Sequence, residues 1–255
     1  MSAPDRYFAE PTLAALYDRF CAVRSDVAFY MDYVMKADSV LDVGCGTGAL
    51  LHQARARGHR GRLCGLDPAG GMLAVAREHD GIEWMEGTLE TVRFEDAFDL
   101  VVMTGHAFQV LLDDAEISRA LAAVHAALGP DGRFAFETRN PLKRAWEGWA
   151  DAYRGTVRNA DGAPVTMHTQ LDAPMHDERV TFTHSFECAD WPAPKISAST
   201  LRFIGADALA RKLADAGFAI EEQFGDWDRQ DFGPSSPEII TVARRMPARP
   251  EEARR

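Results

Sequence analysis

The sequence lacks the features that would point to a membrane or a secreted protein. Its 255 residues contain no apolar run as long as the roughly 18 residues that a membrane-spanning helix needs. The first residues, MSAPDRYFAEPT, carry two acids and no apolar segment, so we expect no signal peptide. These absences predict a cytoplasmic protein that does not associate with a membrane.

Cysteine and metal-ligand patterns are also scarce. The four cysteines, Cys21, Cys45, Cys64 and Cys188, form no CxxC pair and show no zinc-like spacing. Three histidines, His168, His176 and His184, are spread too evenly along the chain to resemble a ligand set. We expect free thiols in a reducing compartment and no bound metal.

Positive charge is in deficit. The chain has 28 basic and 39 acidic residues, a formal net charge of −11, and its basic residues occur only in short groups. An acidic surface repels a phosphate backbone, so a nucleic-acid partner is disfavoured. Hydrophobic residues make up 46% and charged residues 26%, which is typical of a globular protein with a real core.

Strand-like and helix-like segments alternate through the first part of the chain. The expected strands are 39–44, 62–67, 82–87, 98–103 and 132–138, with helices between them. Pro68 suits the first position of a helix over 68–79, and Asp113 with Glu116 matches a capping box. Such alternation predicts a parallel sheet covered by helices on both faces.

The pattern changes after the fifth strand. A short helix is expected over 141–150, followed by stretches of period-2 character in PVTMHTQLD, RVTFTHSFEC and ISASTLRF. A last helix over 206–217 and two closing strands come next. We predict five parts: a helical cap (1–38), a cofactor-binding core (39–140), an antiparallel insertion (141–200), the end of the core (201–246) and a disordered tail (247–255).

The segment LDVGCGTG carries the strongest chemical signal. Gly44, Gly46 and Gly48 follow a strand and precede a helix, where glycine permits a tight turn and close approach of backbone to a ligand. The Asp42 carboxylate would repel a pyrophosphate but would favour a ligand that bears an ammonium and a sulfonium. Asp67 ends the next strand, where a carboxylate can accept hydrogen bonds from ribose hydroxyls.

These motifs together resemble the class I S-adenosylmethionine-dependent methyltransferases. The matching segments, in order, are LDVGCGTG, GLDPAGGMLAVAR, EWMEGTLE, FDLVVMTGH and LGPDGRFAFETRNP. The resemblance covers residues 38–140 strongly and 200–245 more loosely. It implies an α/β three-layer sandwich with a seven-stranded, mostly parallel sheet whose last strand is antiparallel, and S-adenosylmethionine as cofactor.

The resemblance also implies a set of cofactor contacts. Met72 would pack on the adenine, and Thr88 stands where family members often have an aspartate, so its hydroxyl would take over a contact with the adenine amino group. Adding the positions argued from the residues, the candidate cofactor-binding set is Tyr17, Arg24, Asp42, Gly44, Cys45, Gly46, Asp67, Pro68, Met72, Gly87, Thr88, Leu89, Met103 and Thr104. Arg24 could pair with the methionine carboxylate of the cofactor.

His106 is the candidate catalytic residue. In such a sheet the ligand crevice lies where the strand order reverses, between the first and fourth strands, which places His106 near the methyl donor. It could be a general base for a hydroxyl acceptor, a hydrogen-bonding partner of cofactor or substrate, or a loop residue. An amine that is already neutral would need no base.

The insertion is expected to shape the substrate pocket. Trp146 and Trp149 share a helix face, and Phe182, His184 and Phe186 project to one face of their strand. That aromatic face could cover an apolar substrate, or it could serve only to pack the insertion on the core.

We therefore predict a monomeric or homodimeric methyltransferase for a small organic molecule, acting at oxygen, nitrogen or carbon, with a natural product or sugar among the possibilities. The fold-level analogy behind the last point carries little weight alone. Two rivals stay open. One is a protein that binds S-adenosylmethionine without methyl transfer, as a sensor or partner subunit; the other is a nicotinamide-dependent oxidoreductase.

Overall fold

The larger of two sheets carries the fold. A computed structural model describes residues 3–22, 25–78 and 80–247, so Arg24 and residues 248–255 of the predicted tail lie outside it. The strands of this sheet are β1 Ser39–Val43, β2 Arg62–Asp67, β3 Glu83–Glu86, β4 Phe98–Met103, β5 Leu128–Arg139, β10 Phe218–Phe224 and β11 Glu238–Arg245.

The strand order is β10-β11-β5-β4-β1-β2-β3. The pairs among β1 to β5 are parallel, whereas β11 runs antiparallel to both of its neighbours, β5 and β10. The predicted seven-stranded sheet with an antiparallel last strand is confirmed. The strand order reverses between β1 and β4, so the ends of these strands frame the crevice that the sequence predicts.

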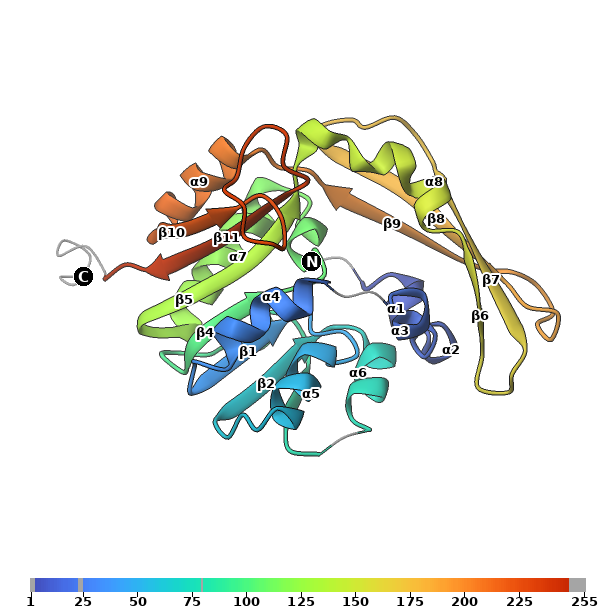
Figure 1. The fold of residues 1–255 in the computed structure, drawn as a ribbon, viewed down its shortest axis with the longest axis horizontal. Helices are drawn as coiled ribbons and strands as arrows, with labels where there is room; N and C mark the ends of the chain where they lie inside the picture. The colour runs from blue at the N-terminus through green and yellow to red at the C-terminus, as the bar shows by residue number, and fades with distance from the viewer. Residues whose placement is uncertain (1–2, 23–24, 79, 248–255) are drawn as a thin grey trace.

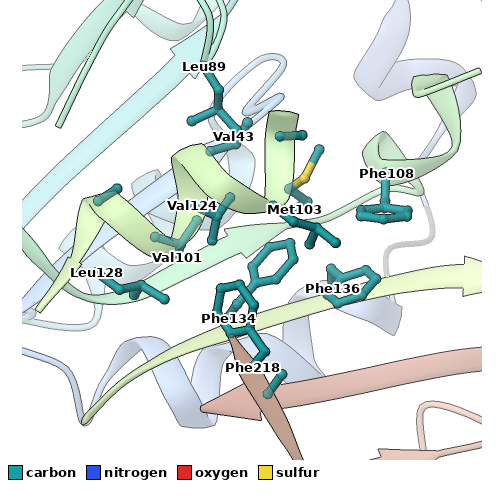
Figure 2. Packing of buried hydrophobic residues seen from close by; sticks show 14 of the residues in the cluster. Val43, Leu89, Val101, Met103, Phe108, Val124, Leu128, Phe134, Phe136 and Phe218 are labelled. Carbon is teal, nitrogen blue, oxygen red and sulfur yellow. The ribbon is translucent and has the colours of Figure 1, made fainter. Parts of the chain in front are cut away.

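Helices cover both faces of this sheet (Figure 1). They are α4 Ser25–Val34, α5 Ala49–Ala56, α6 Gly70–Ala76, α7 Asp114–Ala127 and α9 Ala206–Asp215. Alternation along β4 assigns its residues to the two layers: Val101 and Met103 pack in the cluster with α7 and α9, and Leu100 packs in the cluster with α4 and α5. Figure 2 shows Val101 and Met103 beside Phe134 and Phe136 of β5.

A second, antiparallel sheet is inserted between β5 and α9. Its strands are β6 Gly155–Arg158, β7 Pro164–Leu171, β8 Arg179–Glu187 and β9 Lys195–Arg202, in sequential order. The segment before it forms two short 3₁₀ helices, η2 Pro141–Lys143 and η3 Ala145–Gly148, and then α8 Trp149–Ala152. The predicted antiparallel insertion before the last helix is confirmed.

The N-terminal helices join the two sheets. They are α1 Arg6–Ala9, α2 Pro11–Ala14 and α3 Tyr17–Phe20. Helices α1 and α2 contact α6 of the core, while α1 contacts β9 and α3 contacts β6 of the insertion (Figure 1). Of the predicted helical cap (1–38), helices α1 to α3 therefore lie between α6 and the inserted sheet, whereas α4 packs on the core sheet.

Two local predictions shift by a few residues. The helix predicted to start at Pro68 begins at Gly70, because the Asp67 carboxylate accepts a hydrogen bond from the Ala69 N–H and holds that residue in an extended conformation. The helix predicted to end near Gly129 ends at Ala127, because Leu128 already has strand geometry. The Asp113 cap is as predicted, with its carboxylate accepting from the Glu116 N–H at 2.8 Å. Within the part of the chain that the structure describes, no helix is long and apolar enough to cross a membrane.

Candidate active site

The conformation of the glycine loop after β1 requires residues that have no side chain. Gly44, Gly46 and Gly48 all have positive φ angles, of 74°, 56° and 77°. A Cβ on Gly44 would lie 2.8 Å from the Ala107 Cβ, and one on Gly48 would lie 2.3 Å from the Trp84 ring. Around Gly46, by contrast, a Cβ would meet no described atom within 4 Å. The backbone at Gly46 is therefore open to a ligand, while the loop itself packs against the residue that follows His106.

The Asp67 carboxylate holds the glycine loop in place. One oxygen accepts a hydrogen bond from the Gly46 N–H and the other from the Ala69 N–H, each at 2.8 Å. Asp67 is buried, and this burial raises the pKa of its carboxyl, although the two N–H donors oppose the shift. Each oxygen has a second lone pair, so the carboxylate can fix the loop and still accept from ribose hydroxyls. That ribose contact stays a prediction.

Asp42 and Cys45 flank the same loop. Asp42 is buried on β1, in the position that the sequence predicts for a carboxylate facing a cationic ligand. The Cys45 thiol is also buried, and its pKa is raised well above the ordinary value by burial first and then by the charges of Asp42 and Asp67. A thiol of this kind stays protonated and unreactive, which supports the expectation that Cys45 contributes only its backbone.

The predicted adenine-side residues lie in α6 and in the turn after β3. Met72 is buried against Ala14 and Ala69, with Tyr17 packed on the same cluster. At the turn after β3, the Thr88 hydroxyl accepts from the Glu90 N–H at 3.2 Å, so it is already used to stabilise the turn. Leu89 is buried in the main core cluster, near Val43 and Met103 in Figure 2. Gly87 donates its N–H to the Asp67 carbonyl.

The N-terminal helices are tied to the glycine loop by a residue that the sequence reasoning missed. The Thr47 hydroxyl donates to the Asp18 carboxylate at 2.8 Å, and Thr47 is buried. Its only sequence signal is a hydroxyl within GCGTG. Tyr17, the neighbour of Asp18, lies beside Met72, which suits the predicted role of the cap in covering the cofactor. Arg24 lies outside the described residues.

His106 lies at the end of β4 and takes an unusual backbone conformation. Its φ of 63° follows a φ of 64° at Gly105, and positive values are uncommon for residues other than glycine. The His106 N–H donates to the Glu137 carboxylate at 2.5 Å, and its Nε2 lies 3.0 Å from a carboxylate oxygen of Glu238. The two carboxyl groups fix both the backbone and the ring. Thr104, two residues earlier, is buried beside this turn.

Both carboxyl groups around His106 have perturbed acidity. Burial raises the pKa of Glu238 to about 8, against an opposing effect of Arg139. Burial also raises the pKa of Glu137, whose other oxygen accepts from the Tyr30 hydroxyl. Displaced pKa values that cluster at a strand end are typical of functional sites. Glu238 was missed from sequence; its signal is an acid at the start of the otherwise apolar strand EIITV.

Arg139 connects this end of the core to the insertion. Its guanidinium donates to Gln109 Oε1 at 2.9 Å and to the Tyr153 hydroxyl at 3.1 Å, and it lies 5.2 Å from the centre of the Trp149 ring. Gln109 in turn donates to the Arg202 carbonyl on β9 at 2.9 Å. The inserted sheet is thus joined to the end of β5 close to His106 and Glu238.

Comparison with known proteins assigns the class of protein that this fold and site define. The model of the family described as "Methyltransferase domain" matches residues 40–132, which include the glycine loop, Asp67 and His106. A malonyl-[acyl-carrier protein] O-methyltransferase of Serratia marcescens is 32% identical over 202 residues, covering 77% of this chain and 76% of that protein. The chain belongs to the class I S-adenosylmethionine-dependent methyltransferases.

The names of other similar proteins give different substrates, so they do not identify the substrate of this chain. A 2-phytyl-1,4-naphtoquinone methyltransferase of Thermosynechococcus vestitus is 32% identical over 139 residues, 48% of this chain and 59% of that protein. The aligned part therefore spans little more than half of this relative. A solved methyltransferase from Clostridium acetobutylicum has a TM-score of 0.73 at 15% identity and covers 92% of this chain and 98% of its own. A sugar N-methyltransferase from Streptoalloteichus sp. has a TM-score of 0.70 at 22% identity and covers 91% of this chain and 93% of its own. Both structures establish the fold.

Proposed function

We propose that this chain transfers a methyl group from S-adenosylmethionine to a small organic molecule bound between the strand ends of the core and the inserted sheet. The observation that carries the proposal is that the glycine loop packs against Ala107, the residue after His106, and that His106 is held by Glu137 and Glu238. The relatives act on quinones, acyl carrier proteins or sugars according to their names. Their variety supports a small organic methyl acceptor and leaves open oxygen, nitrogen or carbon.

The residues on the cofactor side fit S-adenosylmethionine. The open backbone at Gly46 permits close approach, Asp67 offers lone pairs to ribose hydroxyls, and Asp42 supplies a negative charge near a cationic ligand. The remaining contacts are proposed for Gly44, Cys45, Pro68, Met72, Gly87, Thr88, Leu89, Met103, Thr104, Tyr17 and Arg24. When bound, S-adenosylmethionine supplies an electrophilic methyl group.

His106 is proposed as the general base for a hydroxyl methyl acceptor. In that role the imidazole would take up the proton that the hydroxyl of the methyl acceptor must lose. His106 can act as a base at Nδ1 when Glu238 is ionised, because the carboxylate, 3.0 Å away, then accepts from Nε2–H and orients the ring. A neutral amine would use His106 for positioning alone.

The wider setting is also part of the proposal. We expect a cytoplasmic enzyme, monomeric or homodimeric, that acts without nucleic acid. The net charge of −11 supports the last point, because an acidic surface repels polyanions.

Calorimetric titration with S-adenosylmethionine and with NAD tests the class of cofactor first. Tight binding of the nicotinamide alone would overturn the proposal. Incubation with methyl-labelled S-adenosylmethionine and a panel of phenols, amino sugars and carboxylic acids then tests transfer. Cofactor binding with no labelled product across the panel would favour a sensor or partner subunit.

A further inference from the structure

A polar row crosses the inner face of the inserted sheet. Thr169 on β7, His184 on β8 and Ser197 on β9 are direct neighbours in the register, and all three are buried. The residues before and after His184 on the same face are Phe182 and Phe186, so the row interrupts an otherwise apolar surface. Buried polar groups cost free energy unless they are hydrogen-bonded, so each of these side chains needs a partner.

His184 lies between the two groups of helices that cover this face. Phe182 packs with Trp149 of α8 in one apolar cluster, while Phe186 packs with Leu16 and Tyr7 of the N-terminal segment in another. His184 falls between the two clusters along β8. Figure 1 shows α8 and helices α1 to α3 against the same sheet, separated along its strands.

Two members of the row have their hydrogen bonds within the protein. The Ser197 hydroxyl oxygen accepts from the Tyr7 N–H at 2.9 Å. The Thr169 hydroxyl donates to the Tyr153 carbonyl at 3.0 Å and lies 2.8 Å from His184 Nδ1. Because a hydroxyl has one proton, Thr169 must accept from His184, and the proton of the imidazole is on Nδ1.

This arrangement leaves His184 Nε2 as a hydrogen-bond acceptor. Burial lowers the pKa of His184 to about 4, so the ring is neutral at physiological pH and Nε2 has a lone pair. Within residues 3–22, 25–78 and 80–247, Nε2 has no hydrogen-bond partner in the protein and is open to solvent.

Four aromatic rings lie around the imidazole of His184. The ring centres of Phe182, Tyr7, Phe186 and Tyr153 lie 5.1, 5.7, 6.1 and 6.2 Å from that of His184. Tyr7 also lies 5.6 Å from Tyr17, which packs beside Met72 at the predicted adenine position. The polar row is therefore joined through two rings to the cofactor side of the site.

We infer that His184 Nε2 and the rings around it form a subsite that recognises a methyl acceptor with an apolar ring and a hydroxyl or N–H donor. The donor group bonds to Nε2, and the ring packs against Tyr7 and Phe182. His184 is thus a specificity-determining residue. The inference rests on the proposed function for the identity of the ligand as methyl acceptor, but the recognition itself can be measured without turnover.

Nitrogen NMR of the full chain labelled with ¹⁵N-histidine tests the inference directly, with phenol as the probe and toluene as its matched analogue. We expect the free protein to show the Nδ1–H tautomer at His184, and phenol to shift the Nε2 signal toward that of a hydrogen-bonded nitrogen. Toluene should leave that signal in place. An Nε2 signal that ignores phenol, or an Nε2–H tautomer, would overturn the inference.

Variants separate recognition from packing. His184→Asn keeps a donor near Thr169 and removes Nε2, so phenol should bind about three- to tenfold more weakly while toluene affinity is unchanged. His168→Asn, on the outer face of β7, is the matched control and should change neither. Equal phenol affinity in His184→Asn and the wild type contradicts the subsite. Failure of methyl transfer with this subsite intact would instead count against the proposed function.

Discussion

The two sides of the site are built in different ways. On the cofactor side, residues 44–48 and Asp67 come from two adjacent strand ends and act through backbone N–H groups and one carboxylate. On the proposed methyl-acceptor side, His106, Glu137 and Glu238 lie in or just after three strands that are distant in sequence, and they would act through buried or half-buried side chains.

The difference reflects what each side must recognise. A cofactor that is always the same can be held by a rigid loop whose shape glycine permits. A methyl acceptor that varies among relatives needs side chains, because side chains alone can change its recognition while the fold is kept. The first kind of site leaves a local sequence motif, whereas the second leaves residues scattered along the chain.

The largest expected effect is on turnover at His106. If His106 is the base, kcat falls about 10²- to 10⁴-fold in both His106→Asn and His106→Ala, with S-adenosylmethionine affinity unchanged by calorimetry. Asparagine tolerates the positive φ at this position better than alanine does. Turnover retained in the asparagine variant alone would therefore mean that His106 positions the substrate and accepts no proton.

Gly44→Ala should damage both sides at once. The positive φ and the 2.8 Å approach to Ala107 together should lower the free energy of unfolding by about 2–4 kcal/mol. Denaturant unfolding measures this. Gly46→Ala is the matched control, since it meets no described atom and should cost only about 1 kcal/mol. Equal losses of unfolding free energy in the two variants would mean that the packing of Gly44 on Ala107 contributes nothing to stability.

Asp67→Ala should act on the cofactor side alone. It removes the acceptor of the Gly46 N–H and the predicted ribose contacts, so S-adenosylmethionine affinity should fall by about 1–3 kcal/mol in calorimetry. Glu78 is an exposed acid just after α6, so the control variant Glu78→Ala should bind S-adenosylmethionine as the wild type does. Wild-type affinity in Asp67→Ala would contradict this assignment of the cofactor site.

The last prediction concerns the pH dependence of stability on the methyl-acceptor side. The folded pKa of Glu238, about 8, lies above its ordinary value of 4.5, so the native state retains a proton that the unfolded chain releases between those values. The stability from this group is fully present below about pH 4.5 and is lost as the pH rises toward 8, by about 1.4 kcal/mol per pH unit at most. Glu238→Gln should flatten the slope in unfolding experiments between pH 5 and 8. Exposed Glu95→Gln should leave it intact; an unchanged slope in Glu238→Gln would be evidence against the raised pKa.

Sequence patterns were sufficient for the fold because its signals are local. Alternating apolar segments identified the strands of the core, and LDVGCGTG with Asp67 identified the cofactor side, since both depend on residues close together in the chain. The start of α6 was placed two residues early at Pro68, because the pattern does not reveal that the Asp67 carboxylate holds Ala69 outside the helix.

By itself, then, the sequence determined a seven-stranded sheet, an antiparallel insertion and an S-adenosylmethionine-dependent methyltransferase. Only the tertiary structure brought Glu238 to His106 and aligned His184 with Thr169, because the first contact crosses from β4 to β11 and the second depends on strand register. The physical reason is that periodicity shows which face a residue occupies, whereas the partner across that face is decided when distant strands pack.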